Sequence, residues 1–225
     1  MRTHWIDKSK QAYNRERLAD MLFEGVSAMS LQLDQRQFDL LLDYQSLLHK
    51  WNGVYNLTAV RDPEAMVRQH LLDSLAAVTA LENAVRVLDV GSGGGLPGIV
   101  LAIARPELRV DLIDTVQKKT AFLNQVRVEL GLENVQVHAG RVENLEVGTP
   151  FDTITSRAFS SLADLVQLSQ HVLAPGGRYI AMKGLVPDEE IEELPPGWCV
   201  SEIRPIKVAG LDAARHLIIM ERKNP

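Results

Sequence analysis

The apolar residues of the first third of the chain recur at helical spacing. Between residues 11 and 29 they stand three or four positions apart, and the same interval returns between residues 33 and 51. This spacing gathers apolar side chains on one face of a helix. A third helix is expected over residues 62–81, because Asp62 is a good N-cap and Pro63 suits the first helical position. The pattern therefore predicts a helical segment at the start of the chain.

From position 85 onward, short apolar runs alternate with helical stretches. Strands are expected at residues 85–90, 109–114, 135–138, 151–155, 178–182, 198–204 and 216–221, and helices at 97–104, 116–130 and 161–173. This alternation predicts parallel strands joined by crossover helices. The last two strands leave no room for a helix between them, so we expect an antiparallel hairpin at the sheet edge. The predicted fold is α/β and Rossmann-like: a seven-stranded, mostly parallel sheet in residues 85–225, with residues 1–84 packed on it as an N-terminal helical extension.

A glycine-rich turn follows the first strand, in the segment VRVLDVGSGGGLPG at 85–98. Such a turn brings backbone N–H groups and the positive end of a helix dipole close to a ligand, which predicts a nucleotide-type site. Gly93, Gly95 and Gly98 satisfy the dinucleotide spacing GxGxxG. Asp89, however, stands inside the strand end, in the pattern V-L-D-x-G-x-G that resembles S-adenosylmethionine-dependent methyltransferases of the Rossmann type. A carboxylate there would accept from the amino group of that cofactor, whereas a pyrophosphate needs no acceptor.

Three later positions suit the same ligand crevice. Asp114 ends the second strand about 20 residues after the turn, where a carboxylate meets ribose hydroxyls in Rossmann-type sites; capping of the next helix is the alternative. Val142 and Glu143 follow the third strand and are candidates for adenine recognition. Arg157 follows the fourth strand, and a cation at the carboxyl end of a central strand lies in the ligand crevice.

Composition narrows the class of protein. No apolar run reaches membrane-spanning length and the N-terminus has no signal-peptide core, so a cytoplasmic protein without membrane contact is expected. The single cysteine, Cys199, excludes a CxxC metal site, and no metal is expected. A net charge of −5 argues against general nucleic-acid binding. Lys118 and Lys119 are either a solvated helix face or contacts to an RNA backbone.

The motif after the fourth strand restricts the methyl acceptor. SRAF stands at 156–159, where methyltransferases of exocyclic amines carry N/D-P-P-Y/F, and no cysteine is placed for pyrimidine C5 chemistry. An acceptor whose lone pair is already free fits both absences, and guanine N7 is such an atom. Arg157 or Lys183 could then donate a hydrogen bond to O6 of that base.

Six segments of the chain resemble the ribosomal RNA small subunit methyltransferase G family, also called glucose-inhibited division protein B. They are WNGVYNLTAVRDPEAMVRQHLLDSL at 51–75, VLDVGSGGGLPGIVLAI at 87–103, KKTAFLNQVRVELGL at 118–132, RVEN at 141–144, SRAF at 156–159 and KG at 183–184. The glycine segment occurs in many methyltransferases, but the combination is specific. The resemblance implies a class I S-adenosylmethionine-dependent methyltransferase that modifies N7 of one guanine in 16S rRNA. Its partner would be 16S rRNA in the small ribosomal subunit or an assembly intermediate.

The resemblance also assigns residues by position. It implies that Gly91, Leu96, Val142, Glu143 and Arg157 bind S-adenosylmethionine and that Asn56, Thr58, His70, Asp73 and Ser74 lie on the substrate side. The candidate sets are: cofactor-binding Asp89, Gly91, Gly93, Leu96, Asp114, Val142, Glu143 and Arg157; catalytic Arg157, Lys183, His70 and Asp73; substrate-binding Asn56, Thr58, Ser74, Lys118 and Lys119.

Several alternatives remain open at this point. His70 and Asp73 are one helical turn apart and could be an ordinary surface pair, and Asn56 and Thr58 could simply form a turn. Val142 stands where the family usually has alanine. A methyltransferase of small molecules or proteins, a nicotinamide-dependent oxidoreductase and a noncatalytic ribosome-associated module are the competing functions.

Overall fold

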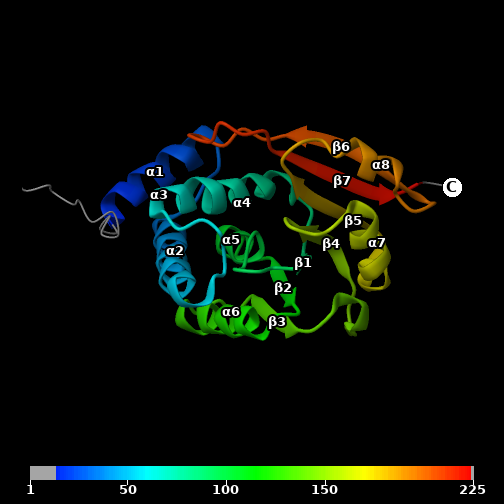
Figure 1. The fold of residues 1–225 in the computed structure, drawn as a ribbon, viewed down its shortest axis with the longest axis horizontal. Coiled ribbons are helices and arrows are strands. Elements are labelled where there is room, and N and C mark those ends of the chain that lie inside the picture. The colour runs from blue at the N-terminus through cyan, green and yellow to red at the C-terminus, as the bar shows by residue number, and fades with distance from the viewer. Residues whose placement is uncertain (1–13, 224–225) are drawn as a thin grey trace, which may run out of the picture.

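A seven-stranded sheet runs through the middle of the protein, whose computed structural model describes residues 14–223 (Figure 1). The strands are β1 (Arg86–Val90), β2 (Arg109–Asp114), β3 (Val135–Ala139), β4 (Phe151–Ser156), β5 (Leu173–Lys183), β6 (Trp198–Pro205) and β7 (His216–Arg222). Their order across the sheet is β3-β2-β1-β4-β5-β7-β6. β1 to β5 pair in parallel, whereas β7 is antiparallel to both β5 and β6. The mostly parallel sheet with its closing hairpin is therefore confirmed.

Helices cover both faces of this sheet (Figure 1). They are α1 (Arg15–Ala28), α2 (Gln35–Tyr55), α3 (Pro63–Met66), α4 (Asp73–Leu75), α5 (Gly98–Ala104), α6 (Gln117–Glu129), α7 (Leu162–Ser169) and α8 (Asp188–Glu192). One hydrophobic cluster joins α1, α2, α4, α5 and α6 to one face of the sheet, and a second joins α7 and α8 to the other. Val87 belongs to the first cluster and its neighbour Leu88 to the second. Because side chains alternate along a strand, both faces of β1 are buried, as its continuous apolar run predicts.

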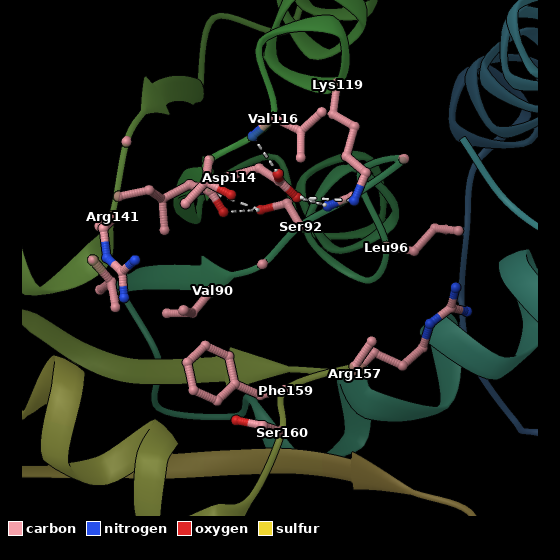
Figure 2. Close-up of a pocket in the computed structure, with 18 of the residues that line it drawn as sticks. Val90, Ser92, Leu96, Asp114, Val116, Lys119, Arg141, Arg157, Phe159 and Ser160 are labelled. Carbon is pink, nitrogen blue, oxygen red and sulfur yellow. Dashed lines mark hydrogen bonds and ion pairs between the residues drawn. The ribbon is translucent and has the colours of Figure 1, made fainter. Parts of the chain in front are cut away.

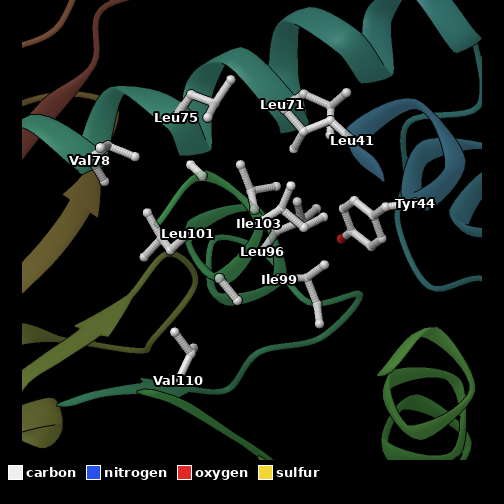
Figure 3. Packing of buried hydrophobic residues seen from close by; sticks show 14 of the residues in the cluster. Leu41, Tyr44, Leu71, Leu75, Val78, Leu96, Ile99, Leu101, Ile103 and Val110 are labelled. Carbon is white, nitrogen blue, oxygen red and sulfur yellow. The ribbon is translucent and has the colours of Figure 1, made fainter. Parts of the chain in front are cut away.

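Helix α2 supports α5 at both ends. Tyr44 is fully buried and donates its hydroxyl hydrogen to the carbonyl oxygen of Gly94 at 2.6 Å, in the turn that precedes α5. Gln37 donates to the carbonyl oxygens of Ile103 and Ala104, at 3.1 and 2.9 Å, at the end of α5. Figure 3 shows Tyr44 beside Leu96 and other side chains of the α5 region. The helical extension thus fixes the turn and the helix that follows it.

The third expected helix, residues 62–81, is helical but not uniform. Asp62 caps it as expected, because its carboxylate accepts from the N–H of Ala65 at 2.7 Å. After α3 the chain passes through a π-helical turn at Val67–Leu72, then α4 and a 3₁₀ turn. Apolar periodicity gives no sign of this change. Since π-helical turns are frequent at functional sites, the position of His70 within this one is notable.

The expected helix at 161–173 is α-helical as far as Ser169 and then continues as a 3₁₀ turn, Gln170–Val172. Helix α7 stops at Ser169, and β5 begins at Leu173, so the Pro-Gly-Gly sequence at 175–177 lies within a strand and not in a turn. Leu173 pairs with Phe151 of β4 across an irregularity in the register. This pairing joins residues distant in sequence, so local spacing could not reveal it.

The helical extension and the sheet share one hydrophobic cluster, which contains residues from both sides of position 84. The division of the chain at 84/85 stays a prediction. Residues 11–13 of the first expected helix lie outside the described residues. In the described part of the chain, no helix combines the length and apolar character needed to cross a membrane.

Candidate functional site

A crevice of about 560 Å³ opens at the carboxyl ends of β1, β2 and β4 (Figure 2). Its walls are the turn after β1, the end of β2, the loops after β3 and β4, and residues 57–58 of the helical extension. Chain crossovers leave β1 and β4 in opposite directions, and ligands of open α/β sheets bind at such a switch point. The volume suits a ligand of nucleoside size.

The glycine turn shapes one wall of this crevice. Gly91 and Gly93 have φ of 72° and 59°, which favour glycine. A Cβ at Gly91 would meet only the Phe159 ring, at 3.9 Å, so side chains here would project into the ligand space. The N–H groups of Gly91 and Ser92 donate to Ile113 at 2.9 and 3.1 Å. Because these donors are engaged within the fold, the turn offers less to a pyrophosphate than its sequence predicts.

Asp89 lies beneath the turn, fully buried, and is not among the residues that line the crevice. Its Oδ2 accepts from the N–H of Gly98 at 2.9 Å, while Oδ1 has no hydrogen-bond partner among the described residues. Burial raises the pKa of Asp89 to about 7, against the opposing effects of the Gly98 hydrogen bond and the Arg157 charge. The unpartnered oxygen is the atom that a cationic ligand group could satisfy.

Asp114 is held at the end of β2 by backbone donors (Figure 2). Its Oδ2 accepts from the N–H of Gly93 and its Oδ1 from the N–H of Val116, both at 2.9 Å. Lys119 lies 3.6 Å from Oδ2. A carboxylate has about four acceptor sites, so this one keeps capacity for a ribose diol. The same bonds show that Asp114 also orders the start of α6, the alternative role expected for it.

The loop after β3 closes the far end of the crevice. Val142 is buried and lines the wall, and Glu143 stands beside it, half-buried. A backbone hydrogen bond and the guanidinium of Arg141 hold the pKa of Glu143 below its usual range. The Arg141 Nε lies 2.6 Å from the Glu143 Oε1. Val142 and Glu143 thus line the crevice, and their role in adenine recognition stays a prediction.

Arg157 stands between this crevice and a second, smaller cavity. It lines both. Its Nη1 donates to the carbonyl oxygen of Gln69 at 3.0 Å and lies 3.6 Å from Asp73 Oδ2. The second cavity measures about 330 Å³, and its lining includes His70, Lys183 and Arg215. The four predicted catalytic residues therefore lie around one cavity: Arg157, His70, Asp73 and Lys183.

His70 is buried in the wall of the second cavity with both ring nitrogens engaged. Nδ1 lies 2.9 Å from the carbonyl oxygen of Gln69, and Nε2 lies 2.8 Å from Thr58 Oγ1. Arg157 Nη1 lies 3.4 Å from the same Nδ1, so the arginine and the Gln69 carbonyl meet at this nitrogen. Burial, and then the Arg157 charge, lowers the pKa of His70 to about 4. The ring is neutral and acts as a fixed part of the wall.

Asp73 is buried between two arginines. Arg215 Nε donates to its Oδ1 at 3.0 Å, and Arg157 approaches its Oδ2. Burial raises the pKa of Asp73, and the charges of Arg157 and Arg215 oppose that rise. Thus His70 and Asp73 do not pair with each other, but both lie beside Arg157, whose Nη1 is 3.4 Å from His70 Nδ1 and 3.6 Å from Asp73 Oδ2.

Lys183 at the end of β5 is tied to helix α8. Its Nζ lies 2.9 and 2.8 Å from the two carboxylate oxygens of Glu190. Glu190 also accepts from the N–H of Leu162, at the start of α7, at 2.8 Å. The ammonium group is therefore oriented, and its charge is largely balanced.

Three predicted substrate residues lie away from both cavities. Asn56 is exposed with φ of 51° and accepts from Arg61 at 2.9 Å. Ser74 is fully buried, and its hydroxyl has no partner among the described residues. Lys118 is exposed on α6, whereas Lys119 and Thr58 line the crevice.

Sequence reasoning missed Tyr44, Phe159 and Arg215. Tyr44 could have been noticed as a tyrosine on the apolar face of a helix, because a buried phenol needs an acceptor. Arg215 could have been found from the hairpin: β7 is antiparallel to β5, so the residue before β7 lies at the same edge as Lys183. Cys199 is a free, half-buried thiol. No set of three or more His, Cys, Asp or Glu residues within 14–223 is placed to hold a metal ion.

Parallel strands with a switch point between β1 and β4, an acidic residue under a glycine turn and a closing antiparallel hairpin define a class I methyltransferase fold. Solved structures with this fold include the mitomycin 7-O-methyltransferase MmcR (TM-score 0.58, 15% identity, 95% of this chain and 70% of that chain). Another is the glycopeptide N-methyltransferase MtfA complexed with S-adenosyl-L-methionine (TM-score 0.56, 15% identity, 68% and 87%). At such identity the likeness concerns the fold alone.

The family follows from closer relatives. The family described as rRNA small subunit methyltransferase G matches residues 37–218. A protein named ribosomal RNA small subunit methyltransferase G from Janthinobacterium sp. (strain Marseille) is 56% identical, over 94% of this chain and 98% of its own. One of the same name from Herminiimonas arsenicoxydans is 58% identical, over 94% and 99%. The chain belongs to the rRNA small subunit methyltransferase G family, as the six segments predict, and is a methyltransferase.

Proposed function

We propose that this enzyme transfers the methyl group of S-adenosylmethionine to N7 of a guanine in 16S rRNA. The relatives' names support small-subunit rRNA as the substrate. The two adjoining cavities support a two-substrate reaction, because donor and acceptor must meet for an in-line displacement. The larger cavity would hold the cofactor and the smaller one the acceptor.

The residues of the larger crevice fit this cofactor. Asp114 would accept from the ribose hydroxyls, and Val142 with Glu143 would flank the adenine. Gly91, Gly93 and Leu96 would pass the methionine part, for which the open space above the two positive-φ glycines leaves room. Bound S-adenosylmethionine supplies an electrophilic methyl group on a positively charged sulfur.

The pairing of the titratable groups that line the second cavity supports the proposal for N7. His70 is neutral with both nitrogens engaged, Asp73 is held by two arginines, and Lys183 is paired with Glu190. Among the described residues that line this cavity, no side chain is free to remove a proton; Asp89, whose Oδ1 has no partner, does not line it. An acceptor that needs no deprotonation fits such a site.

Guanine N7 meets this requirement. Its lone pair forms the new N–C bond while the electrons of the C–S bond stay with sulfur, so positive charge passes from sulfur to the purine and no proton is released. Arg157 and Lys183 would donate to O6, while His70 and Asp73 would keep Arg157 in place. Thr58 would hold the His70 ring in position through the hydrogen bond between its hydroxyl and Nε2. Positioning would supply most of the rate.

The outer contacts complete the proposal. Lys119 and the exposed Lys118 and Asn56 would face the RNA. Ser74 would not touch it, because this residue is fully buried and lines neither cavity. The RNA would be presented in the small subunit or an assembly intermediate, in the cytoplasm. No metal takes part in the proposed step.

The test measures methyl incorporation and maps its position. Wild-type enzyme and labelled S-adenosylmethionine are incubated with naked 16S rRNA, small subunits and assembly intermediates from a strain that lacks the gene. We expect label at one guanine N7, lost in Arg157→Ala. Label in protein or small molecules would favour the second kind of methyltransferase. S-adenosylhomocysteine binding without any turnover would favour a noncatalytic module, and tight NAD binding would favour the oxidoreductase.

A further inference from the structure

The second cavity adjoins the cofactor crevice through a single side chain, Arg157. An acceptor atom in line with the methyl donor must therefore lie at this boundary, with the remainder of the acceptor group in the second cavity. The cavity measures about 330 Å³, sufficient for one planar base taken out of its stack. Its position thus suits the target base itself.

The charges around this cavity select the base. Arg157, Lys183 and Arg215 are donors only, and the one buried carboxylate, Asp73, lies between the two arginines. Guanine presents two acceptors, N7 and O6, on one edge, whereas adenine presents its amino group where guanine has O6. With N7 directed at the boundary, O6 meets a cationic wall. The amino group of adenine is a hydrogen-bond donor, so it would face the donors of the same wall and could not bond to them.

Arg215 reaches the cavity because of the hairpin topology. His216 of β7 pairs with Lys183 of β5, so Arg215 lies at the carboxyl edge of the parallel strands although it comes near the end of the chain. Its Nε donates to Asp73 and its Nη1 to Ala214. Among the described residues its Nη2 has no hydrogen-bond partner. A guanidinium has five N–H donors in a rigid fork, so donors remain for a ligand.

We propose that the second cavity receives the target guanine and that Arg215 binds an acceptor on that base, oriented by Asp73. The inference rests on the proposed function and adds the site and the residue that distinguish the base. Asp73 holds both guanidinium groups, Arg215 at 3.0 Å and Arg157 at 3.6 Å, and so sets the spacing of the donors. Arg215 is not part of the cofactor crevice.

The test compares Arg215→Gln and Arg215→Lys with Arg204→Gln. Arg204 is a matched control on the neighbouring strand β6, paired with the exposed Glu202 and donating to Thr79. Each variant is assayed with small subunits from a strain lacking the gene, at saturating cofactor, and its binding of S-adenosylhomocysteine is measured by calorimetry. We expect Arg215→Gln to raise KM for the particle by roughly 10- to 100-fold, the size expected for one lost charged contact to a base edge. The dissociation constant of S-adenosylhomocysteine should stay within about 2-fold, as the contact lies outside the cofactor crevice.

The conservative variant separates binding from folding. Arg215→Lys keeps the charge beside Asp73 but loses the planar fork, so it should fold like wild type and recover only part of the affinity. If Arg215→Gln does not fold, the KM of Arg215→Lys decides, and a wild-type value overturns the inference.

Other outcomes also overturn it. A KM for Arg215→Gln equal to that of Arg204→Gln would show that Arg215 does not touch the substrate. An equal loss of S-adenosylhomocysteine affinity would assign Arg215 to the cofactor, and methylation of an adenine would contradict the base selection. Failure of wild type to methylate any small-subunit RNA is a different result, since it removes the proposed function as well.

Discussion

Replacement of Asp89 by asparagine should raise the stability of the protein relative to wild type as pH rises, while weakening cofactor binding. The carboxyl group is fully buried under the glycine turn, and its Oδ1 has no partner among the described residues. Burial raises its pKa from 3.8 to about 7. In the unfolded chain the group ionises near its ordinary value, so the folded state holds a proton that the unfolded state has lost.

The sign and size of the effect follow from this difference. Where the folded state binds more protons, stability falls as pH rises. The folded pKa of about 7 lies about 1.5 units above pH 5.5. Each unit corresponds to about 1.36 kcal/mol, so the free energy of unfolding of the wild type should fall by about 2 kcal/mol between pH 5.5 and 8.5. Asparagine keeps an acceptor for Gly98 but does not ionise. The stability difference between variant and wild type should therefore grow by about 2 kcal/mol between these two pH values.

The assay is urea unfolding of both proteins at pH 5.5 and 8.5, in which other titrating groups cancel because both chains carry them. S-adenosylhomocysteine titration at pH 8.5 gives the functional side, and we expect Asp89→Asn to bind about 10-fold more weakly or worse, since an ionised partner is lost. A stability difference that is the same at both pH values would refute the reasoning. It would mean that Asp89 is already ionised in the fold at pH 5.5.

Three further predictions concern the surroundings of the site. Tyr44→Phe should cost about 1–3 kcal/mol in urea unfolding, because the Gly94 carbonyl loses its donor in a buried place; an unchanged midpoint would contradict this. Gly98→Ala should lower the free energy of unfolding by about 1–3 kcal/mol, because the added Cβ would overlap Leu112 and lie 2.8 Å from Asp89 Oδ2. Gly53→Ala in α2 is the control. Its added Cβ meets nothing within 4 Å, so it should raise the free energy of unfolding by about 0.5–1 kcal/mol. Burial lowers the pKa of His70 to about 4, so the stability of the wild type relative to His70→Gln should fall by about 3 kcal/mol as pH drops from 6.5 to 4. Asp89 changes stability in the opposite direction over this range, but it is present in both proteins and cancels from their difference. A difference in unfolding free energy that is the same at both pH values would show that the ring is not buried as described.

The sequence was sufficient for most of the fold because its apolar runs are local signals. Each of the seven strands was expected within a few residues of its place, except that β5 begins at Leu173 and not at 178. That early start depends on pairing with Phe151, and the π-helical turn that carries His70 depends on packing. The spacing of apolar residues along the chain predicts neither the strand pairing nor the packing.

For the site, sequence reasoning located the residues next to recognisable strand ends. Asp114 and Arg157 lie where a parallel sheet must place them. Asp89 differs, because sequence gives its place on the strand but not that it lies behind the turn. Arg215 and Tyr44 depend on contacts over 142 and 50 positions, to Asp73 and Gly94, which only the folded chain brings together.

These long contacts change what the helical extension does. Tyr44 holds the glycine turn, Thr58 lines the cofactor crevice, and His70 and Asp73 form a wall of the second cavity. Arg215, from the other end of the chain, is oriented by Asp73 of the extension. Because the two cavities take walls from both the extension and the sheet, the extension cannot be a separate RNA-binding module attached to a complete methyltransferase domain. The sheet positions the ends of its strands, and the extension adds the walls that make two adjoining cavities at those ends.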